Sequence, residues 1–480
     1  MTGTPAVPQR LARYATVPSR LLAVCVVTAG GALLLWYVIT SGVHHARQGV
    51  RTIGQDAAPS IFAAQQIRAR LADLHAEAAN DLLAGGLGST TARQAYTADL
   101  EHVATALVTV ARNLTYPEEF QPIVEMQQQL VVYTGLIEEA RTEIRHGNPV
   151  GVAFLRRSDN IMSTKLMPAA QRLDDVNQRH LEAQYTTRTG QAWRTIAIVL
   201  LLGLALGLGL GWQQRYVRRI FRRRYNLGLL SASGLTLCLA AYTAWALGTS
   251  QMHLRTAKQD TFDSVYALLR LHAEANQANA AESLWLLAPG AGQSYVQRFQ
   301  ESAQHILDPA VTTALVEGGW KASEGQQLRA DGQTTTAHTL VARRLAEEAI
   351  TRKKTVTGFL GNALANITLP GEGTSATEIL VWYVHYMALD SLIRTSESEG
   401  RHWDAVELCV GTKPGQSNWA FQHLDKAISR TLALNMRGFD TAVAQASGVF
   451  RGLDMAAPAL LLLVVLCTVW GLWPRIAEFR

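Results

Sequence analysis

The chain has 480 residues, with 44 lysines and arginines against 38 aspartates and glutamates, and a formal net charge of +6. So small an excess of positive charge does not indicate a nucleic-acid partner, and we expect none. Three of the four cysteines, Cys25, Cys238 and Cys467, lie in strongly apolar stretches, so we predict no disulfide between Cys409 and another cysteine outside a bilayer.

Four apolar stretches are each long enough to cross a membrane, because a helix needs roughly 20 apolar residues to span the hydrocarbon layer. The apolar stretches 21–43, 195–212, 227–250 and 456–473 contain no Asp, Glu, Lys, Arg or His. The predicted transmembrane helices cover residues 21–43, 194–212, 227–250 and 456–473. Ion-coupled transporters usually carry charged groups at the membrane midplane, so the charge-free spans disfavour a transporter.

The short connections predict the orientation of the spans. The loop 213–226 contains six arginines and no acidic residue, and it should therefore be cytoplasmic. The tails 1–20 and 474–480 are also basic and should lie on the same side, in the cell (plasma) membrane. The long segments 44–193 and 251–455 then lie outside the cytoplasm. The loop most simply sets the topology; alternatively, it docks an acidic partner or membrane lipid through Arg218, Arg219, Arg222, Arg223 and Arg224.

Segment 44–193 is predicted to form a four-helix bundle. Glycines at 85–88, Tyr116-Pro117 and Gly147-Asn148-Pro149 divide it into four long helices with apolar residues at three- and four-residue spacing. No breaker separates the first and fourth of these helices from their spans, so each span should continue outward into the bundle.

Segment 251–455 should repeat this plan with long helices over 227–287 and 416–473. Leu71–Ala78 resembles Leu268–Ala275, and Leu166–Asn177 resembles Leu424–Asn435. The second copy is longer, with insertions expected at 318–337 and 368–377. The sequence thus predicts an all-α membrane protein with four transmembrane helices and two extracytoplasmic helical bundles in tandem.

Glycines at four-residue spacing in the second span, Gly203, Gly207 and Gly211, allow close helix packing in lipid. Packing against another span of the same chain is the simpler interpretation. The alternative is the face of a homodimer or a helix that can slide during signalling.

A polar stripe on the repeated His-Ala-Glu-Ala segment is the main candidate for a ligand or partner surface. His272, Asn276, Asn279 and Ser283 share one helical face in the second copy, and Glu77, Asn80 and Asp81 cluster in the first. Such a stripe either binds a small polar ligand or consists of mutually satisfied buried pairs, which is more common.

Aromatic residues flank the start of the last long helix. We expect Trp403, Trp419 and Phe421 to pack inside the domain. The alternative is an exposed aromatic patch that binds a protein through Trp403 and Trp419.

Signatures of enzymes are missing: there is no Walker loop, G-x-S-x-G, HExxH or dinucleotide fingerprint. No Cys/His pair has zinc spacing. We therefore expect no catalytic residue, no cofactor and no metal.

The tandem span–bundle–span plan, the arginine-rich loop and Gly-x-Ser-Asn-Trp-Ala-Phe at Gly415–Phe421 resemble the actinobacterial GlnX-like membrane proteins. More distantly, the plan is similar to four-helix-bundle sensor domains of bacterial receptors. The resemblance implies amino-acid sensing together with an extracytoplasmic solute-binding lipoprotein (GlnH) and a cytosolic Ser/Thr protein kinase (PknG).

The leading hypothesis is therefore a transmembrane signal-relay protein without an output domain of its own. The alternative is a non-signalling scaffold or assembly protein of the cell envelope.

Overall fold

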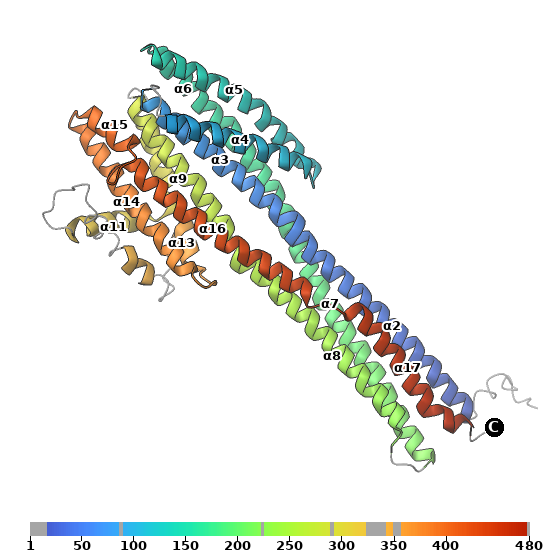
Figure 1. The fold of residues 1–480 in the computed structure, drawn as a ribbon. Helices are drawn as coiled ribbons and strands as arrows, with labels where there is room; N and C mark the ends of the chain where they lie inside the picture. Colours follow the sequence, from blue (N-terminus) through green and yellow to red (C-terminus); the bar gives the residue numbers. More distant parts are fainter. Residues whose placement is uncertain are drawn as a thin grey trace, which may run out of the picture. The chain divides into compact units, whose positions relative to one another are not determined.

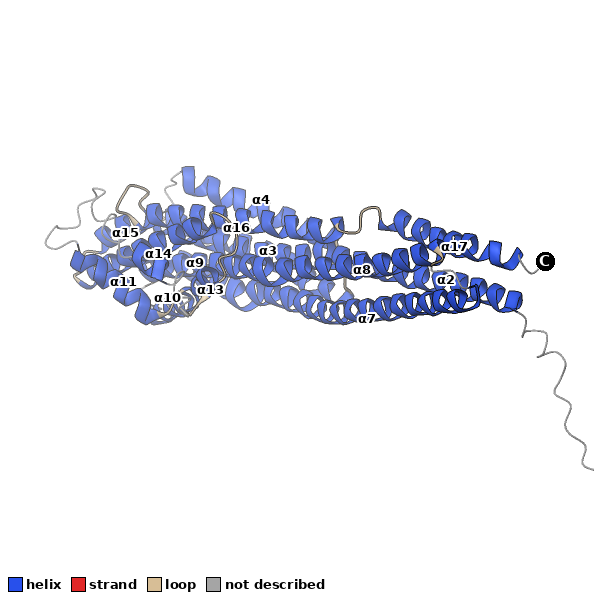
Figure 2. Cartoon of the chain, turned by 90° about the horizontal axis from the view of Figure 1, so that it is seen from below, coloured by secondary structure: helices blue, strands red, loops and turns tan. Residues whose placement is uncertain are grey.

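The structure is a computed structural model that describes residues 17–85, 90–221, 225–288, 292–322, 342–348 and 357–477. This described part consists of helices and loops and contains no strand (Figure 2). Four of its helices are long and apolar enough to cross a membrane. The predicted fold class, an all-α membrane protein, is confirmed, while the exact limits of the spans stay predictions.

The long helices of the first half follow the predicted breakers. Helices α2 (Val17–Arg51) and α3 (Ala58–Leu83) are joined by the π-helical turn η2 (Thr52–Ala57), without a loop. Helix α4 (Thr90–Arg112) and helix α5 (Phe120–Arg145) come next, separated by the short η3 (Pro117–Glu119). The fourth helix comprises α6 (Val150–Ile161), the π-helical η4 (Met162–Leu166) and α7 (Met167–Phe221).

The second half contains the same kind of long helices and several shorter ones (Figure 1). Helix α8 (Leu227–Arg255) continues through η5 (Thr256–Phe262) into α9 (Asp263–Leu287). Between α9 and α16 lie the short helices α10 (Gly292–Ile306), α11 (Pro309–Ala322), α13 (Phe359–Ala365) and α15 (His402–Val410), together with the longer α14 (Glu372–Ser398). The last two helices are α16 (Ser417–Gly448) and α17 (Leu453–Ala477). Most of the predicted insertion at 318–337 lies outside the described residues.

One prediction was wrong: the last long helix is not continuous over 416–473. Helix α16 ends at Gly448, and four residues in turns precede α17. Gly452 has a φ of +82°, a left-handed conformation that glycine adopts without the steric cost of a side chain. Arg47 of α2 donates to the Phe450 carbonyl at 2.7 Å and to the Asp454 carboxylate at 2.6 Å, so the turn is held in place.

Clustering of the chain gives two compact units. The apolar unit comprises residues 1–53, 182–255 and 442–480, and the bundle unit comprises residues 54–181 and 256–441. The two segments predicted as separate bundles thus belong to one compact unit. Helices α3 and α9, one from each half, pack along each other and share a core with the helices around them.

Glycines in the second span pack inside the apolar unit. A Cβ placed on Gly203 would lie 2.4 Å from the Cβ of Ala240 on α8, and one on Gly207 would lie 3.0 Å from Leu237. A Cβ on Gly211 would have nothing within 4 Å. The interpretation as packing within the chain is confirmed for Gly203 and Gly207, and the dimer face stays a prediction.

Candidate functional site

The two His-Ala-Glu-Ala segments lie on the neighbouring helices α3 and α9. They contribute to two polar regions, one in which arginines pair with the buried carboxylates and one in which carboxylates predominate. His75 of α3 and Glu274 of α9 contribute to the first, which we call the charged pocket. His272 of α9 and Glu77 of α3 belong to the second, which we call the acidic cluster.

The charged pocket is a cavity of about 370 Å³ between helices of both halves of the bundle unit. Seven ionisable side chains line its wall. They are Arg68, His75, Asp159, Glu274, Arg298, Glu301 and His305. Apolar wall is contributed by Ala72, Met162, Met167 and Leu284. A cavity with a few convergent polar groups and apolar walls is the usual form of a small-molecule site.

Asp159 is the centre of the first group of ion pairs in this pocket. The Arg298 guanidinium donates to both of its carboxylate oxygens, at 2.6 and 2.8 Å. His75 Nε2 lies 3.2 Å from Oδ1, and the Tyr295 hydroxyl donates to Oδ2 at 3.4 Å. Burial raises the pKa of Asp159, but the hydrogen bonds from His75 and Arg298 outweigh it and hold the pKa below its usual range. Asp159 is therefore a carboxylate at any physiological pH.

Glu274 is the centre of the second group. Arg68 Nη2 donates to Oε1 at 3.0 Å, and His305 Nδ1 lies 3.3 Å from Oε2. Glu274 is almost fully buried, whereas the side chains of Arg298 and His305 are 39% and 61% exposed. The two buried carboxylates thus form the interior of the pocket, and the exposed side chains of Arg298 and His305 lie where solvent and a ligand can reach them.

The π-helical segment η4 contributes Met162 and Ser163 to the pocket wall. A π-helical turn adds one residue to the helical repeat, and such turns often occur at functional sites. The extra residue changes the face that the fourth helix of the first half presents before and after Met162.

The acidic cluster comprises Asp73, Glu77, Asp99, His272 and Asp425. His272 Nε2 lies 2.6 Å from Asp425 Oδ1. Arg70 Nη1 lies 3.3 Å from Asp73 and 3.5 Å from Asp99. Burial, followed by the neighbouring carboxylates, raises the pKa of Asp73 to about 6 and that of Glu77 to about 8. Part of this cluster therefore takes up and releases protons near neutral pH.

The predicted polar stripe on α9 is buried and internally paired. His272, Asn276 and Asn279 are all less than a tenth exposed. Asn279 accepts a hydrogen bond from Asn80 of α3 at 3.4 Å, and Ser283 donates to the same Asn80 at 2.5 Å. The Asn276 amide donates to the backbone carbonyl of His272 at 3.3 Å. These contacts match the interpretation as buried pairs, and a ligand role for the stripe stays a prediction.

The two predicted tryptophans do not lie in one patch. Trp419 packs edge-on against Trp382, with ring centroids 5.2 Å apart, and against His423 at 4.6 Å. Trp403 on α15 is 80% exposed, so the prediction that it packs inside the domain was wrong. Helix α15 is only nine residues long and buries its opposite face through Ala405, Val406 and Cys409.

The predicted docking arginines are described in part. Arg218 and Arg219 lie in the last turn of α7 with exposed side chains. Arg222, Arg223 and Arg224 lie outside the described residues. In the described part of the chain, no group of three or more His, Cys, Asp or Glu side chains is arranged to hold a metal ion.

Most of the charged pocket was not predicted from the sequence. His75 and Glu274 lie in the repeated segment, but Asp159, Arg298 and His305 were not singled out. Arg298 and His305 lie on α10, outside the two pairs of segments whose sequences repeat, so the repeat could not indicate them. The pairing of His75 with Glu274 in one pocket depends on the contact between α3 and α9, which crosses the two halves.

A family model described as an actinobacterial sensor domain matches residues 49–186. No curated protein and no solved structure matches the chain. The matched segment is well under half of the chain, and it contains Arg68, His75 and Asp159 of the charged pocket. The match supports a sensor-type actinobacterial protein with a sensing or signalling role.

Proposed function

We propose that this chain is a transmembrane signal-relay protein that senses an extracytoplasmic amino acid and passes the signal to a cytosolic Ser/Thr protein kinase. The cue would arrive through a solute-binding lipoprotein, as the resemblance to GlnX-like proteins implies. The observation that carries the proposal is the charged pocket, because three of its ionisable residues belong to the segment that matches a sensor domain.

The chemistry of the pocket suits a small zwitterion or a polar loop of a binding protein. Guanidinium groups pair with carboxylates in a bidentate geometry, and buried carboxylates pair with ammonium groups. Arg298 and Asp159 form such a bidentate pair in the structure described here. An incoming carboxylate would compete with Asp159 for Arg298, and an incoming ammonium would compete with Arg68 or His305 for Glu274.

The long helices supply a route for the signal. Helix α7 is continuous from Met167 to Phe221, and α2–η2–α3 and α8–η5–α9 follow one another without a loop. The π-helical turns η2 and η5 lie at the boundaries between the two units, at Ile53/Gly54 and Arg255/Thr256. A π-helical turn is a point where a helix can change register by one residue, so a small rotation in the bundle unit could be passed along each helix.

The output would be read at the basic loop between α7 and α8, which we place in the cytoplasm together with both tails. Arg218 and Arg219 are exposed there and could contact an acidic surface of the kinase. In this proposal the chain itself is not an enzyme, and its partners carry the catalysis.

The test replaces Asp159 by asparagine in the full chain, expressed in cells that lack the natural copy. Asparagine keeps the size of the side chain but removes the charge that binds Arg298 and His75. We expect the kinase to lose its response to added amino acid, measured as phosphorylation of its substrate. Asp440→Asn is the matched control, because Asp440 is exposed and lies outside the pocket.

A normal response in the Asp159→Asn variant, at a normal level of protein in the membrane, would contradict the proposal. Capture of the chain from membranes adds a second measurement. Recovery of a solute-binding lipoprotein and a kinase supports signal relay, whereas recovery of cell-wall enzymes alone supports the scaffold.

A further inference from the structure

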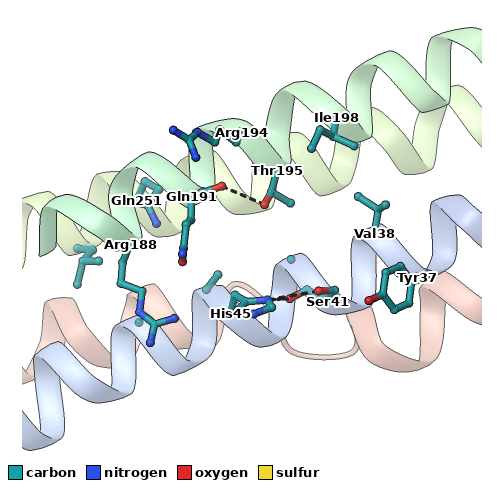
Figure 3. Close-up of a pocket in the computed structure, with 15 residues that line it drawn as sticks. Tyr37, Val38, Ser41, His45, Arg188, Gln191, Arg194, Thr195, Ile198 and Gln251 are labelled. Atoms are coloured by element: carbon teal, nitrogen blue, oxygen red, sulfur yellow. Dashed lines mark hydrogen bonds between the residues drawn. The ribbon is translucent and has the colours of Figure 1, made fainter. Parts of the chain in front are cut away.

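The apolar unit contains a cavity of its own, which the proposed function does not use. It has a volume of about 350 Å³ and lies between α2 and α7, and Gln251 and Leu254 of α8 also line it (Figure 3). All of its lining residues belong to the apolar unit. The cavity lies where α2 and α7 change from apolar to polar sequence.

The wall of this cavity, which we call the groove, changes from apolar to polar along its length. One end is lined by Tyr37, Val38 and Ile198, and the other by His45, Arg188 and Gln191. Figure 3 shows Arg188 and Gln191 reaching from α7 toward α2, with Val38 and Ile198 at the opposite end of the gap. Such a gradient matches an amphiphile, with a polar head at one end and a hydrocarbon chain at the other.

Small residues shape the groove. A Cβ on Gly42 would lie 2.3 Å from the Cγ2 atom of Thr195, so the two helices meet at this point because Gly42 has no side chain. Further along, a Cβ on Gly49 would lie 3.5 Å from the side chain of Arg188. The stem of Arg188 thus runs close to α2, which keeps its guanidinium in the groove.

The polar end is positively charged. No lining residue is acidic, and among the described residues Arg188 has no ion pair with a carboxylate. His45 Nδ1 donates to the carbonyl of Ser41 at 2.7 Å, which orients its ring. Arg194 also lines the cavity, but Figure 3 shows its side chain on the face of α7 turned away from α2. Arg188 is therefore the main group that can bind an anion here.

Aromatic residues place this level of the helices at the membrane surface. Trp36 and Tyr37 on α2 and Trp193 on α7 are 41%, 68% and 59% exposed. Exposed tryptophan and tyrosine rings at the ends of transmembrane helices prefer the headgroup layer. A ligand in the groove would thus have its polar head at the level of lipid headgroups and its tail beside the hydrocarbon.

We propose that this groove is a binding site for an anionic phospholipid. The phosphate group lies at Arg188, with a hydrogen bond from the Gln191 amide, and one acyl chain lies along Val38 and Ile198. The bound lipid lies along the groove beside the point where Gly42 meets Thr195, and so it joins the two helices of the first half at the membrane surface.

The experiment uses the full chain purified in detergent and measures lipid binding by native mass spectrometry. Phosphatidylglycerol is added in one arm, phosphatidylcholine in the second and glycerol phosphate in the third. We expect retention of phosphatidylglycerol only, because phosphatidylcholine has no net charge and glycerol phosphate has no acyl chain. The Arg188→Gln variant should lose about tenfold in affinity for phosphatidylglycerol, since it loses a charge-assisted contact to phosphate.

Two further variants separate the site from general effects of charge and folding. Arg51→Gln removes the same charge from an exposed position on α2 outside the groove and should leave the affinity unchanged. Ile198→Trp fills the apolar end without changing charge and should also weaken binding. Equal binding of both phospholipids, equal losses in the Arg188 and Arg51 variants, or binding of glycerol phosphate as tight as that of the lipid would overturn the proposal.

Discussion

The charged pocket and the acidic cluster are built from the same motif but differ in their supply of positive charge. On the first side, His75 and Glu274 lie among Arg68, Arg298 and His305, and every buried carboxylate has a cation beside it. On the second side, His272 and Glu77 lie among three aspartates, and Arg70 is the nearest arginine.

The neighbouring helices explain the difference. Helix α10 brings Arg298 and His305 to the first side, whereas α4 and α16 bring Asp99 and Asp425 to the second. A repeated motif therefore does not fix the charge state of its residues; the helices packed around it do. On the first side Asp159 stays ionised, which suits binding, and on the second side Asp73 and Glu77 exchange protons near neutral pH.

Of the substitutions on the two sides, removal of Arg298 should cause the largest loss in the free energy of unfolding. Arg298→Met leaves the buried Asp159 with His75 and Tyr295 alone, and breaking a buried pair by removing one partner costs about 3 kcal/mol. The side chain of Arg298 is 39% exposed, but that of Asp159 is only 6% exposed, so the cost comes from the carboxylate left behind. Thermal unfolding of the purified chain at pH 7 measures the loss.

The corresponding variant on the second side is Arg70→Met. We expect the free energy of unfolding to fall by less than about 1 kcal/mol, because Arg70 is 42% exposed and the nearby carboxylates can take up protons instead of remaining charged. Equal losses in the two variants would show that the two sides do not differ in the way described.

The long helices of the molecule could be predicted from the sequence. Long charge-free stretches indicated the four membrane helices, and glycines and prolines at 85–88, 117 and 147–149 indicated the breaks, because these residues interrupt helices through local backbone geometry. The turn before α17 was missed, although Gly448 and Gly452 bracket it, because single glycines also occur inside helices.

The sites could not be predicted to the same extent. The His-Ala-Glu-Ala segments are recognisable in the sequence, but helical spacing groups His272 with its own helix neighbours Asn276 and Asn279. In the structure His272 pairs with Asp425, and Glu274 pairs with Arg68, more than a hundred residues away in each case. Such pairs depend on tertiary packing, which helical periodicity within one segment does not contain.

Glu77→Gln should sharpen the contrast through its dependence on pH. The pKa of Glu77 in the folded chain is about 8, above the ordinary value of 4.5, so the folded state is favoured by protonation and loses this contribution as the pH rises through 8. Glutamine stays neutral at every pH. The free energy of unfolding of the variant should therefore equal that of the natural chain at pH 4. At pH 9 it should be larger by about 2 kcal/mol, after allowance for solvent screening.

Thermal unfolding at the two pH values tests this expectation. Glu139→Gln serves as the control, because Glu139 is exposed on α5, and it should show no gain at either pH. A gain in the Glu77 variant that is the same at pH 4 and pH 9 would contradict a raised pKa and would indicate better packing of the amide instead.

His272→Gln should have the smallest effect and the opposite dependence on pH. Burial lowers the pKa of His272, but the hydrogen bond and charge of Asp425, together with Asp73, outweigh burial and raise the pKa above 6.5. The ion pair thus stabilises the folded chain fully below pH 6.5 and loses this contribution as the pH rises through the folded-state pKa. Glutamine still donates a hydrogen bond to Asp425 but carries no charge.

We expect the variant to lose about 1 kcal/mol in the free energy of unfolding at pH 6 and less at pH 9. Thermal unfolding measures this loss, and the exposed control His146→Gln should show no such trend. A loss that grows with pH would mean that His272 is neutral in the folded chain, and the acidic cluster would then hold its protons on carboxylates alone.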